Sequence, residues 1–477
     1  MKIKNYRIIL LAFVTTMIFS CEDAIDIVQE GELSPTKAYQ TVSDMNQGLL
    51  GIYGIFDGAT DISFASVFTD EVRIGFANGG QGLIEGEYLF NLNPTSADAS
   101  TIWYNNYQII NFSTRIIKAA EKITPAAGEE ATYADILAQA HILRAWGHFR
   151  LLTYFSEDMT DDAALGVTLL DFVPLTTQKL PRNTNAEVFA LINADLLKES
   201  DLTSNATNLN RNFISKDFVK AFRARMALYR EDYATASTLA SELITSYPLT
   251  IRTQYANLWA DIPVTGADEV IFRYDYILGD FLMGSIWASV NSTVSGSPFY
   301  EVSSQLNALL APNDVRRGVI IHPTATADVV PVGKYRGTGT SARLNDVKVF
   351  RTSEMYFIRA EAKADAEDFV GVAADLQAVL NRRFTVAPVV AVPANKQAAF
   401  AEILKQRRVE LAFEGHRYID MRRLGPKALV DINRSAADCE QYSACFLSSS
   451  DYRFVMPIPV SEIGANPAIA TQQNPGY

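Results

Sequence analysis

Two glutamates, a histidine and five arginines fall within the stretch RRVELAFEGHRYIDMRRLG, Arg407 to Gly425. If this stretch is one helix, Glu410 and Glu414 share a face with two of the arginines. A carboxylate pair is the machinery of a glycosidase, but one acid must then hold its proton near neutral pH. The flanking arginines favour the ionised form of both glutamates instead. We therefore expect a structural helix, in which Gly415 allows close packing against a neighbour.

Other catalytic signatures are missing from the sequence. It contains no G-x-S-x-G, P-loop or H-E-x-x-H motif, and it has four histidines in all. We predict no catalytic residues, no metal site and no cofactor, so the protein is not expected to be an enzyme. Oxygen ligands for a structural calcium ion could come from several Asp/Asn loops, and the sequence does not decide whether one is bound.

The amino-terminal residues are typical of an exported chain. Three basic residues precede the apolar run IILLAFVTTMIF, which is too short to span a bilayer but matches the apolar part of a cleaved signal over residues 1–20. Ser20 followed by Cys21 resembles a bacterial lipobox, which would make Cys21 the lipid anchor; a plain secretory signal is the alternative. Glu22 and Asp23 resemble the acidic tag of Bacteroidetes lipoproteins displayed on the outer membrane surface. Several acyl chains would anchor the protein stably.

The remaining cysteines, Cys439 and Cys445, occur in CEQYSAC. In an oxidising compartment they either form a disulfide around a small loop or stay as two free thiols, and the sequence leaves both open. Zinc is disfavoured because no histidine lies near the pair. The net charge of −12 becomes −15 without the signal, because residues 1–20 hold three basic and no acidic residues. This charge argues against nucleic acid as a partner.

Helical periodicity dominates the chain on both sides of a long irregular segment. Helices are predicted around Trp103 and from Tyr133 to Phe155, and helix–turn–helix pairs over Ser215–Pro248 and Arg351–Arg383. Alanines opposite aromatic residues, with a proline after about 34 residues, are typical of tetratricopeptide pairs. Stacked pairs bury one another's apolar faces. We predict a mainly α fold with a helical-pair scaffold and long irregular loops forming the ligand face.

The segment of about residues 249–350 is rich in Gly, Ser, Thr and Asn with single aromatic residues, and shows neither helical nor clean strand periodicity. Ordered loops of this length are usually functional. We expect residues 21–477 to form one domain. Its predicted parts are a helical half over about 30–248, the irregular insertion over about 249–350, and a second helical half with a closing segment over about 351–477.

Taken in order along the chain, these features resemble the SusD/RagB family of Bacteroidetes nutrient-binding lipoproteins. The resemblance is carried by HILRAWGHFRLLTYF, ALYREDYATASTLASELI, FRTSEMYFIRAEAKA, RRVELAFEGHRYIDMRRLG and the final MPIPVSEIGANPAIATQQNPGY. It implies a lid on a SusC-type TonB-dependent outer-membrane barrel, which captures an oligosaccharide or polysaccharide and hands it to the barrel without a catalytic step. Hinge-like opening of a rigid lid suits a helical scaffold.

The resemblance also implies where a ligand binds. TDEVRIGFANGG matches a turn next to the ligand site of the starch-binding family member, which points to Arg73, Phe76 and Asn78. Trp287, in GDFLMGSIWASV, is the aromatic candidate from the middle segment. Aromatic faces stack on sugar rings, and Arg and Asn donate hydrogen bonds to hydroxyls. Ile74 stands where a second stacking residue is expected, which argues against starch.

Three hypotheses compete for the function. The first is the glycan-binding lid, with a peptide-binding RagB-like lid as its variant. The second is a surface lipoprotein glycoside hydrolase, which needs a carboxylate pair in the loops. The third is a tetratricopeptide adaptor for proteins alone, which the long Gly/Ser/aromatic segment disfavours.

Overall fold

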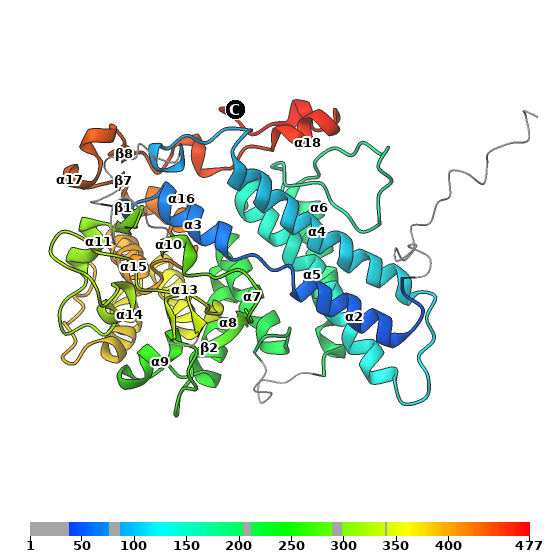
Figure 1. Ribbon diagram of the computed structural model, residues 1–477, viewed down its shortest axis with the longest axis horizontal. Coiled ribbons are helices and arrows are strands. Elements are labelled where there is room, and N and C mark those ends of the chain that lie inside the picture. Colours follow the sequence, from blue (N-terminus) through cyan, green and yellow to red (C-terminus); the bar gives the residue numbers. More distant parts are fainter. Residues whose placement is uncertain (1–37, 76–85, 204–210, 289–297, 339–340) are drawn as a thin grey trace, which may run out of the picture.

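A computed structural model describes residues 38–75, 86–203, 211–288, 298–338 and 341–477 (Figure 1). The predicted signal over residues 1–20 and the predicted anchor Cys21 therefore lie outside the described residues. The fold is mainly helical, which confirms the predicted fold class. Nothing tests the predicted division into three parts, which stays a prediction.

One side of the molecule is a bundle of long helices. Its members are α2 (Val42–Tyr53), α4 (Ala97–Ala120), α5 (Glu130–Phe155) and α6 (Asn185–Leu196). Helix α5 contacts the other three, and α4 also contacts α2. The shorter α3 (Ala59–Phe68) continues from α2 toward the other side of the molecule (Figure 1). Both long helices predicted in this half of the chain are present as α4 and α5.

The other side is a stack of helix pairs that continues across the irregular segment. It contains α7 (Lys216–Tyr229) with α8 (Tyr233–Ser246), and α13 (Thr352–Asp365) with α14 (Phe369–Arg383). Helix α13 packs on α8, so the second pair stacks directly on the first although about a hundred residues separate them (Figure 1). Both predicted tetratricopeptide-type pairs are thus confirmed, and they bury each other's apolar faces.

The two pairs turn by the same local device. Glu231 and Glu367 both adopt positive φ, at 60° and 59°. The aspartate that follows each of them, Asp232 or Asp368, caps the next helix by accepting a hydrogen bond from a backbone N–H three residues on. An acceptor at this position satisfies one of the free N–H groups at a helix start. The repeated turn is direct evidence that the pairs are structural repeats.

Short elements replace regular structure between the pairs and near the carboxyl end. The strands form two-stranded antiparallel sheets, β1 with β3, β2 with β6, β4 with β5, and β7 with β8. Their bounds are β1 (Val72–Ile74), β2 (Val270–Tyr274), β3 (Tyr300–Val302), β4 (Gly337–Thr338), β5 (Ser341–Ala342), β6 (Val347–Arg351), β7 (Ile432–Asn433) and β8 (Phe446–Leu447). The short helices are α9 (Tyr255–Trp259), α10 (Ser285–Ala288), α11 (Ser304–Leu309), α12 (Arg317–Ile320), α17 (Ala436–Cys439) and α18 (Val460–Ala465).

The single helix predicted across residues 407–425 is wrong. Helix α15 (Lys396–Glu410) ends at Glu410, and α16 (Arg417–Ala428) begins seven residues later. Between them Phe413 and Gly415 adopt positive φ, at 60° and 81°, which no continuous helix permits. Gly415 is therefore needed for its backbone conformation, because only glycine adopts it without strain. Close packing, the reason expected from the sequence, is not what requires it.

The carboxyl-terminal residues fold back onto the first helical half (Figure 1). The Met456 N–H donates to the Tyr154 carbonyl at the end of α5, at 2.8 Å. Arg182 donates to the Gln472 carbonyl at 2.6 Å and to the Asn474 Oδ1 at 2.9 Å. The chain therefore closes on itself, with its last segment joined to elements formed some three hundred residues earlier.

Candidate functional site

A cleft of about 760 Å³ lies at the α2–α3 junction. Helix α4 and the segment from β2 to α10 form its other walls. Aromatic rings and short polar side chains alternate in its lining. The aromatic members are Tyr53, Phe56, Tyr274, Tyr276, Phe281 and Tyr300, and the polar ones are Asp57, Thr60, Ser63, Asp98, Asn105, Asp275, Asp280 and Ser285.

The aromatic wall is held in place by its own contacts. The Phe56 ring stacks on Tyr274 with centroids 4.4 Å apart, and Tyr53 meets Phe56 edge-on at 5.4 Å. The Tyr276 hydroxyl donates to the Phe56 carbonyl and accepts from the Gly58 N–H, both at 3.2 Å. Phe281 differs from these residues because its side chain is 52% exposed. Its ring face is the one most available to a ligand.

The polar wall is ordered around Asp57. One carboxylate oxygen accepts from the Ala59 N–H at 2.8 Å, at the start of α3. The other accepts from the Thr60 hydroxyl at 2.7 Å and from the Asn105 amide of α4 at 3.1 Å. This network fixes donors and acceptors from two helices at one place in the cleft. Preorganised polar groups beside aromatic faces are what recognition of a polyhydroxylated ligand requires.

Two of the four residues predicted for ligand binding lie within the described chain, and both make internal contacts. Arg73 lies in β1, where its guanidinium pairs with Glu301 at 2.8 Å and donates to the Asp328 carbonyl at 2.8 Å. Trp287 lies in α10 and is 3% exposed, with its ring edge-on to Phe413 at 5.2 Å. Phe76 and Asn78 lie outside the described residues. The role of these four residues in binding stays a prediction.

The turn Thr69–Glu71, which located those residues in the sequence, is a structural anchor. Asp70 accepts from Arg417 at 2.8 and 2.9 Å and pairs with Arg408 at 3.3 Å. Burial opposes the charge of Asp70, yet these arginines hold its pKa well below the usual range. Burial raises the pKa of Glu71 to about 7, against hydrogen bonds from the Ser66 hydroxyl and the Phe413 N–H. The turn thus joins α3 and β1 to α16.

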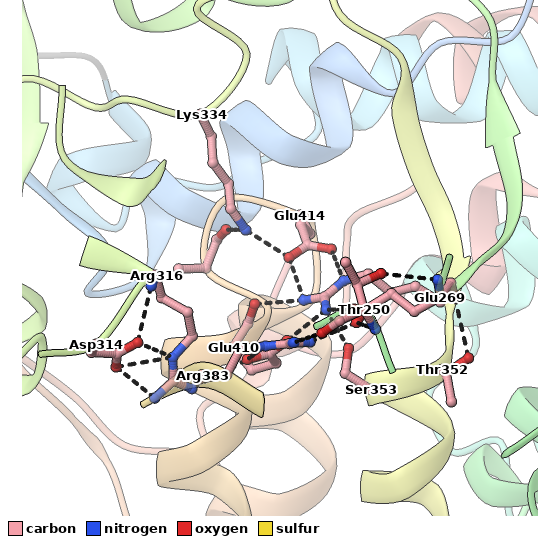
Figure 2. Close-up of polar contacts among 12 residues, drawn as sticks. Thr250, Glu269, Asp314, Arg316, Lys334, Thr352, Ser353, Arg383, Glu410 and Glu414 are labelled. Atoms are coloured by element: carbon pink, nitrogen blue, oxygen red, sulfur yellow. Dashed lines mark hydrogen bonds and ion pairs between the residues drawn. The ribbon is translucent and has the colours of Figure 1, made fainter. Parts of the chain in front are cut away.

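The glutamates of the first stretch discussed above belong to a buried charge cluster (Figure 2). Glu410 accepts from Arg351 at 2.6 Å, from Arg383 at 2.8 Å and from Arg316 at 3.2 Å. Burial alone would raise the pKa of Glu410, but the three arginines bring it well below its usual range. The residue is therefore ionised and cannot act as a general acid, as the sequence argument expected.

Glu414 lies on the other side of the α15–α16 turn and completes this cluster. It accepts from Lys334 at 2.6 Å and from Arg351 at 2.7 Å. Burial lowers the pKa of Lys334 to about 8, although Glu414 opposes that shift. The cluster has four acids and four bases with nearly fully buried side chains: Glu269, Asp314, Glu410 and Glu414 with Arg316, Lys334, Arg351 and Arg383.

The two cysteines of the CEQYSAC stretch are paired in the structure. Cys439 and Cys445 are joined by a disulfide, with Cα atoms 5.1 Å apart.

Within the described ranges, no group of three or more His, Cys, Asp or Glu side chains is arranged as metal ligands. No helix among the described residues has the length and apolar run needed to cross a bilayer.

Similarity to known proteins extends over nearly the whole chain. Residues 325–477 match the model of the SusD family. SusD-like protein P2 of Formosa agariphila is 22% identical over 99% of this chain and 100% of its own length, and SusD-like protein P38 is 24% identical over 88% and 91%. The chain is thus similar to the SusD family model over its carboxyl-terminal third and to SusD-like proteins over nearly its whole length.

Solved structures of the SusD superfamily have the same fold. A member from Bacteroides thetaiotaomicron superposes with a TM-score of 0.76 at 23% identity, covering 91% of this chain and 100% of its own. A SusD-like carbohydrate binding protein from Bacteroides vulgatus gives 0.73 at 18% identity, covering 91% and 98%. At these identities the likeness establishes the fold of this chain.

The sequence did not predict the residues that line the cleft. They come from separate segments, and only folding brings Asp57, Asn105 and Tyr276 together. Phe281 lies within GDFLMGSIWASV, the stretch that supplied Trp287. Exposure in the folded chain distinguishes the two: the apolar residues of the run Ile277–Leu282, which precedes α10, are all exposed, whereas Trp287 is 3% exposed. An apolar residue in such a loop points to a surface role, whereas Trp287 on a helix packs inward.

Proposed function

We propose that this protein is a surface lipoprotein that binds a glycan and acts as the lid of a SusC-type TonB-dependent outer-membrane importer. The observation that carries the proposal is the cleft, which is lined by the half-exposed Phe281 and by the Asp57–Thr60–Asn105 network. An aromatic face contacts the C–H groups of a sugar ring, while carboxylate, amide and hydroxyl groups bond its hydroxyls. The SusD-like carbohydrate binding protein with this fold supports the same ligand class.

The proposal involves binding without turnover. Glu410 and Glu414, the carboxylate pair that the sequence singled out, are buried in ion pairs away from the cleft. A glycoside hydrolase would instead need a proton donor and a second carboxylate on opposite sides of a bound sugar. Incubation of the protein with each glycan that it binds should release no new reducing ends.

The experiment on the binding site compares two exposed phenylalanines. Phe281→Ala should weaken binding of a glycan selected on an oligosaccharide array by about three- to tenfold, as expected for one lost ring contact. Phe446→Ala, at a ring 61% exposed on β8 and outside the cleft, is the matched control and should bind like the wild type. Equal affinities of the two variants for the glycan, measured by titration calorimetry, would show that the ligand does not bind in this cleft.

The anchoring and the partner are tested in the native membrane. Cys21→Ser should abolish incorporation of radiolabelled palmitate, and protease shaving of intact cells should digest the wild-type protein. Gentle detergent extraction should recover a much larger TonB-dependent barrel in near-stoichiometric amount. A monomer without a barrel would contradict the lid role, and a panel on which peptides bind while glycans do not would favour the RagB-like alternative.

A further inference from the structure

The cleft has an unbalanced charge. Four carboxylates line it, from Asp57, Asp98, Asp275 and Asp280, and no Lys, Arg or His side chain is among its described lining residues. A concave surface with one sign of charge concentrates its field in the enclosed space.

Three of these carboxylates, Asp57, Asp275 and Asp280, have no cationic partner among the described contacts. Asp57 accepts hydrogen bonds only from neutral groups, the Thr60 hydroxyl, the Asn105 amide and backbone N–H groups. Asp280 accepts from the Ile277 N–H at 2.7 Å, and Asp275 lies at the exposed edge. Neutral donors hold a carboxylate in place without cancelling its charge, whereas a guanidinium would do both.

From this arrangement we infer that the cleft selects against anionic glycans and takes neutral or amino-bearing oligosaccharides. The inference rests on the proposed function and specifies its substrate class. A uronate or sulfate group in the cleft would lie near several like charges, with no cationic side chain among the described lining residues to pair with it, while a sugar hydroxyl can donate to the carboxylates. Recognition of anionic glycans normally depends on Arg and Lys, which provide bidentate or point-charge contacts. Repulsion of the wrong ligand is an ordinary source of specificity.

The first test is an oligosaccharide array containing four classes: neutral gluco-, galacto-, manno- and xylo-oligosaccharides, chitosan oligomers, oligogalacturonides, and sulfated galactans. Bound members should be neutral or amino-bearing, and Phe281→Ala should weaken them. Phe281-dependent binding of an oligogalacturonide or a sulfated galactan would overturn the inference while leaving glycan binding intact. Binding of no class at all would instead overturn the proposed function, and the inference with it.

The second test isolates charge. The bound neutral oligosaccharide is compared with its own C6-oxidised form, which carries uronate groups on the same backbone. At low salt the wild type should bind the oxidised form about tenfold more weakly, since a few like charges at 6–8 Å cost on the order of 1 kcal/mol in water. The difference between the two affinities should decrease as added salt screens the repulsion between the uronate groups and the carboxylates.

Two variants then test whether the difference in affinity between the neutral and oxidised oligosaccharides arises in the cleft. In the double variant Asp275→Asn/Asp280→Asn the ratio of the two affinities should move toward one. Glu440→Gln removes one exposed carboxylate outside the cleft and should keep the wild-type ratio. An unchanged ratio in the double variant, or equal affinity of the wild type for both forms at low salt, would overturn the inference.

Discussion

The cluster around Glu410 and the cleft around Asp57 contain the same number of carboxylates in opposite circumstances. In the cluster, four acids are matched by four cationic side chains and excluded from water. In the cleft, Asp57 and Asp280 accept from neutral donors and Asp275 is exposed to solvent. A buried charge without a partner costs several kcal/mol, so the interior has to be neutral as a whole. A surface cleft carries no such requirement, and its net charge is free to act on a ligand.

Substitutions in the buried cluster around Glu410 should lower the stability of the protein more than substitutions in the cleft. Glu410→Gln keeps the size of the side chain but leaves Arg351, Arg383 and Arg316 without the carboxylate that they share. We expect it to lower the free energy of unfolding by about 3–5 kcal/mol, measured by urea denaturation. Glu402→Gln, on the same helix at a partly exposed site, should change it by less than about 0.5 kcal/mol. Similar small losses in both variants would show that the cluster tolerates an uncompensated charge.

Glu71 sharpens the comparison because it is buried but has no ion pair among the described contacts. Its pKa is about 7 in the folded protein against 4.5 ordinarily. Between these values the folded state holds a proton that the unfolded state has lost, so the free energy of unfolding falls as pH rises from about 4.5 to 7. A glutamine at this position cannot ionise. Glu71→Gln should therefore reduce the fall in the free energy of unfolding with pH by up to about 3 kcal/mol.

The measurement for Glu71 is urea denaturation of the wild type and of Glu71→Gln at pH 5 and pH 8. The stability of the variant relative to the wild type should be greater at pH 8. Glu440→Gln, at an exposed site, controls for the general titration of the surface. A difference between Glu71→Gln and the wild type that is the same at both pH values would place the Glu71 pKa near its ordinary value.

The cleft carboxylates should give the smallest effect on stability. Asp275 is exposed, and an asparagine at position 280 can still accept from the Ile277 N–H. The double variant Asp275→Asn/Asp280→Asn should therefore keep its free energy of unfolding within about 0.5 kcal/mol, with a slight gain from reduced repulsion. A loss of more than about 2 kcal/mol would mean that these residues hold the fold together, contrary to the contrast with the cluster.

The sequence predicted the parts of this molecule that depend on local periodicity. The helix pair predicted over Ser215–Pro248 buries a stripe of Phe218, Phe222 and Met226 on α7, because a helix repeats its faces every three to four residues. The break after Glu410 escaped prediction because Phe413, a bulky residue, takes a positive φ that no sequence pattern indicates. Tertiary contacts of the turn, such as that of Glu414 with Lys334, stabilise this conformation.

The candidate site was less predictable for a different physical reason. Its walls come from α2, α3, α4 and the β2–α10 segment, and no local pattern records which of them become neighbours. The family resemblance directed attention to Arg73 and Trp287, whose side chains are occupied by Glu301 and Phe413 in the folded chain. Exposure separates Phe281 from Trp287, and exposure is a property of the assembled structure.

The return of residues 456–477 to the first helical half determines when the protein can finish folding. The carbonyl of Tyr154 and the guanidinium of Arg182 acquire these partners only when Met456, Gln472 and Asn474 are present. Contacts between such distant parts of a chain form slowly, because a long loop must close first. For a chain exported as we propose, the slow formation of these contacts keeps the polypeptide unfolded during translocation. The native state then becomes available only on the far side of the membrane, once the last residues have passed through.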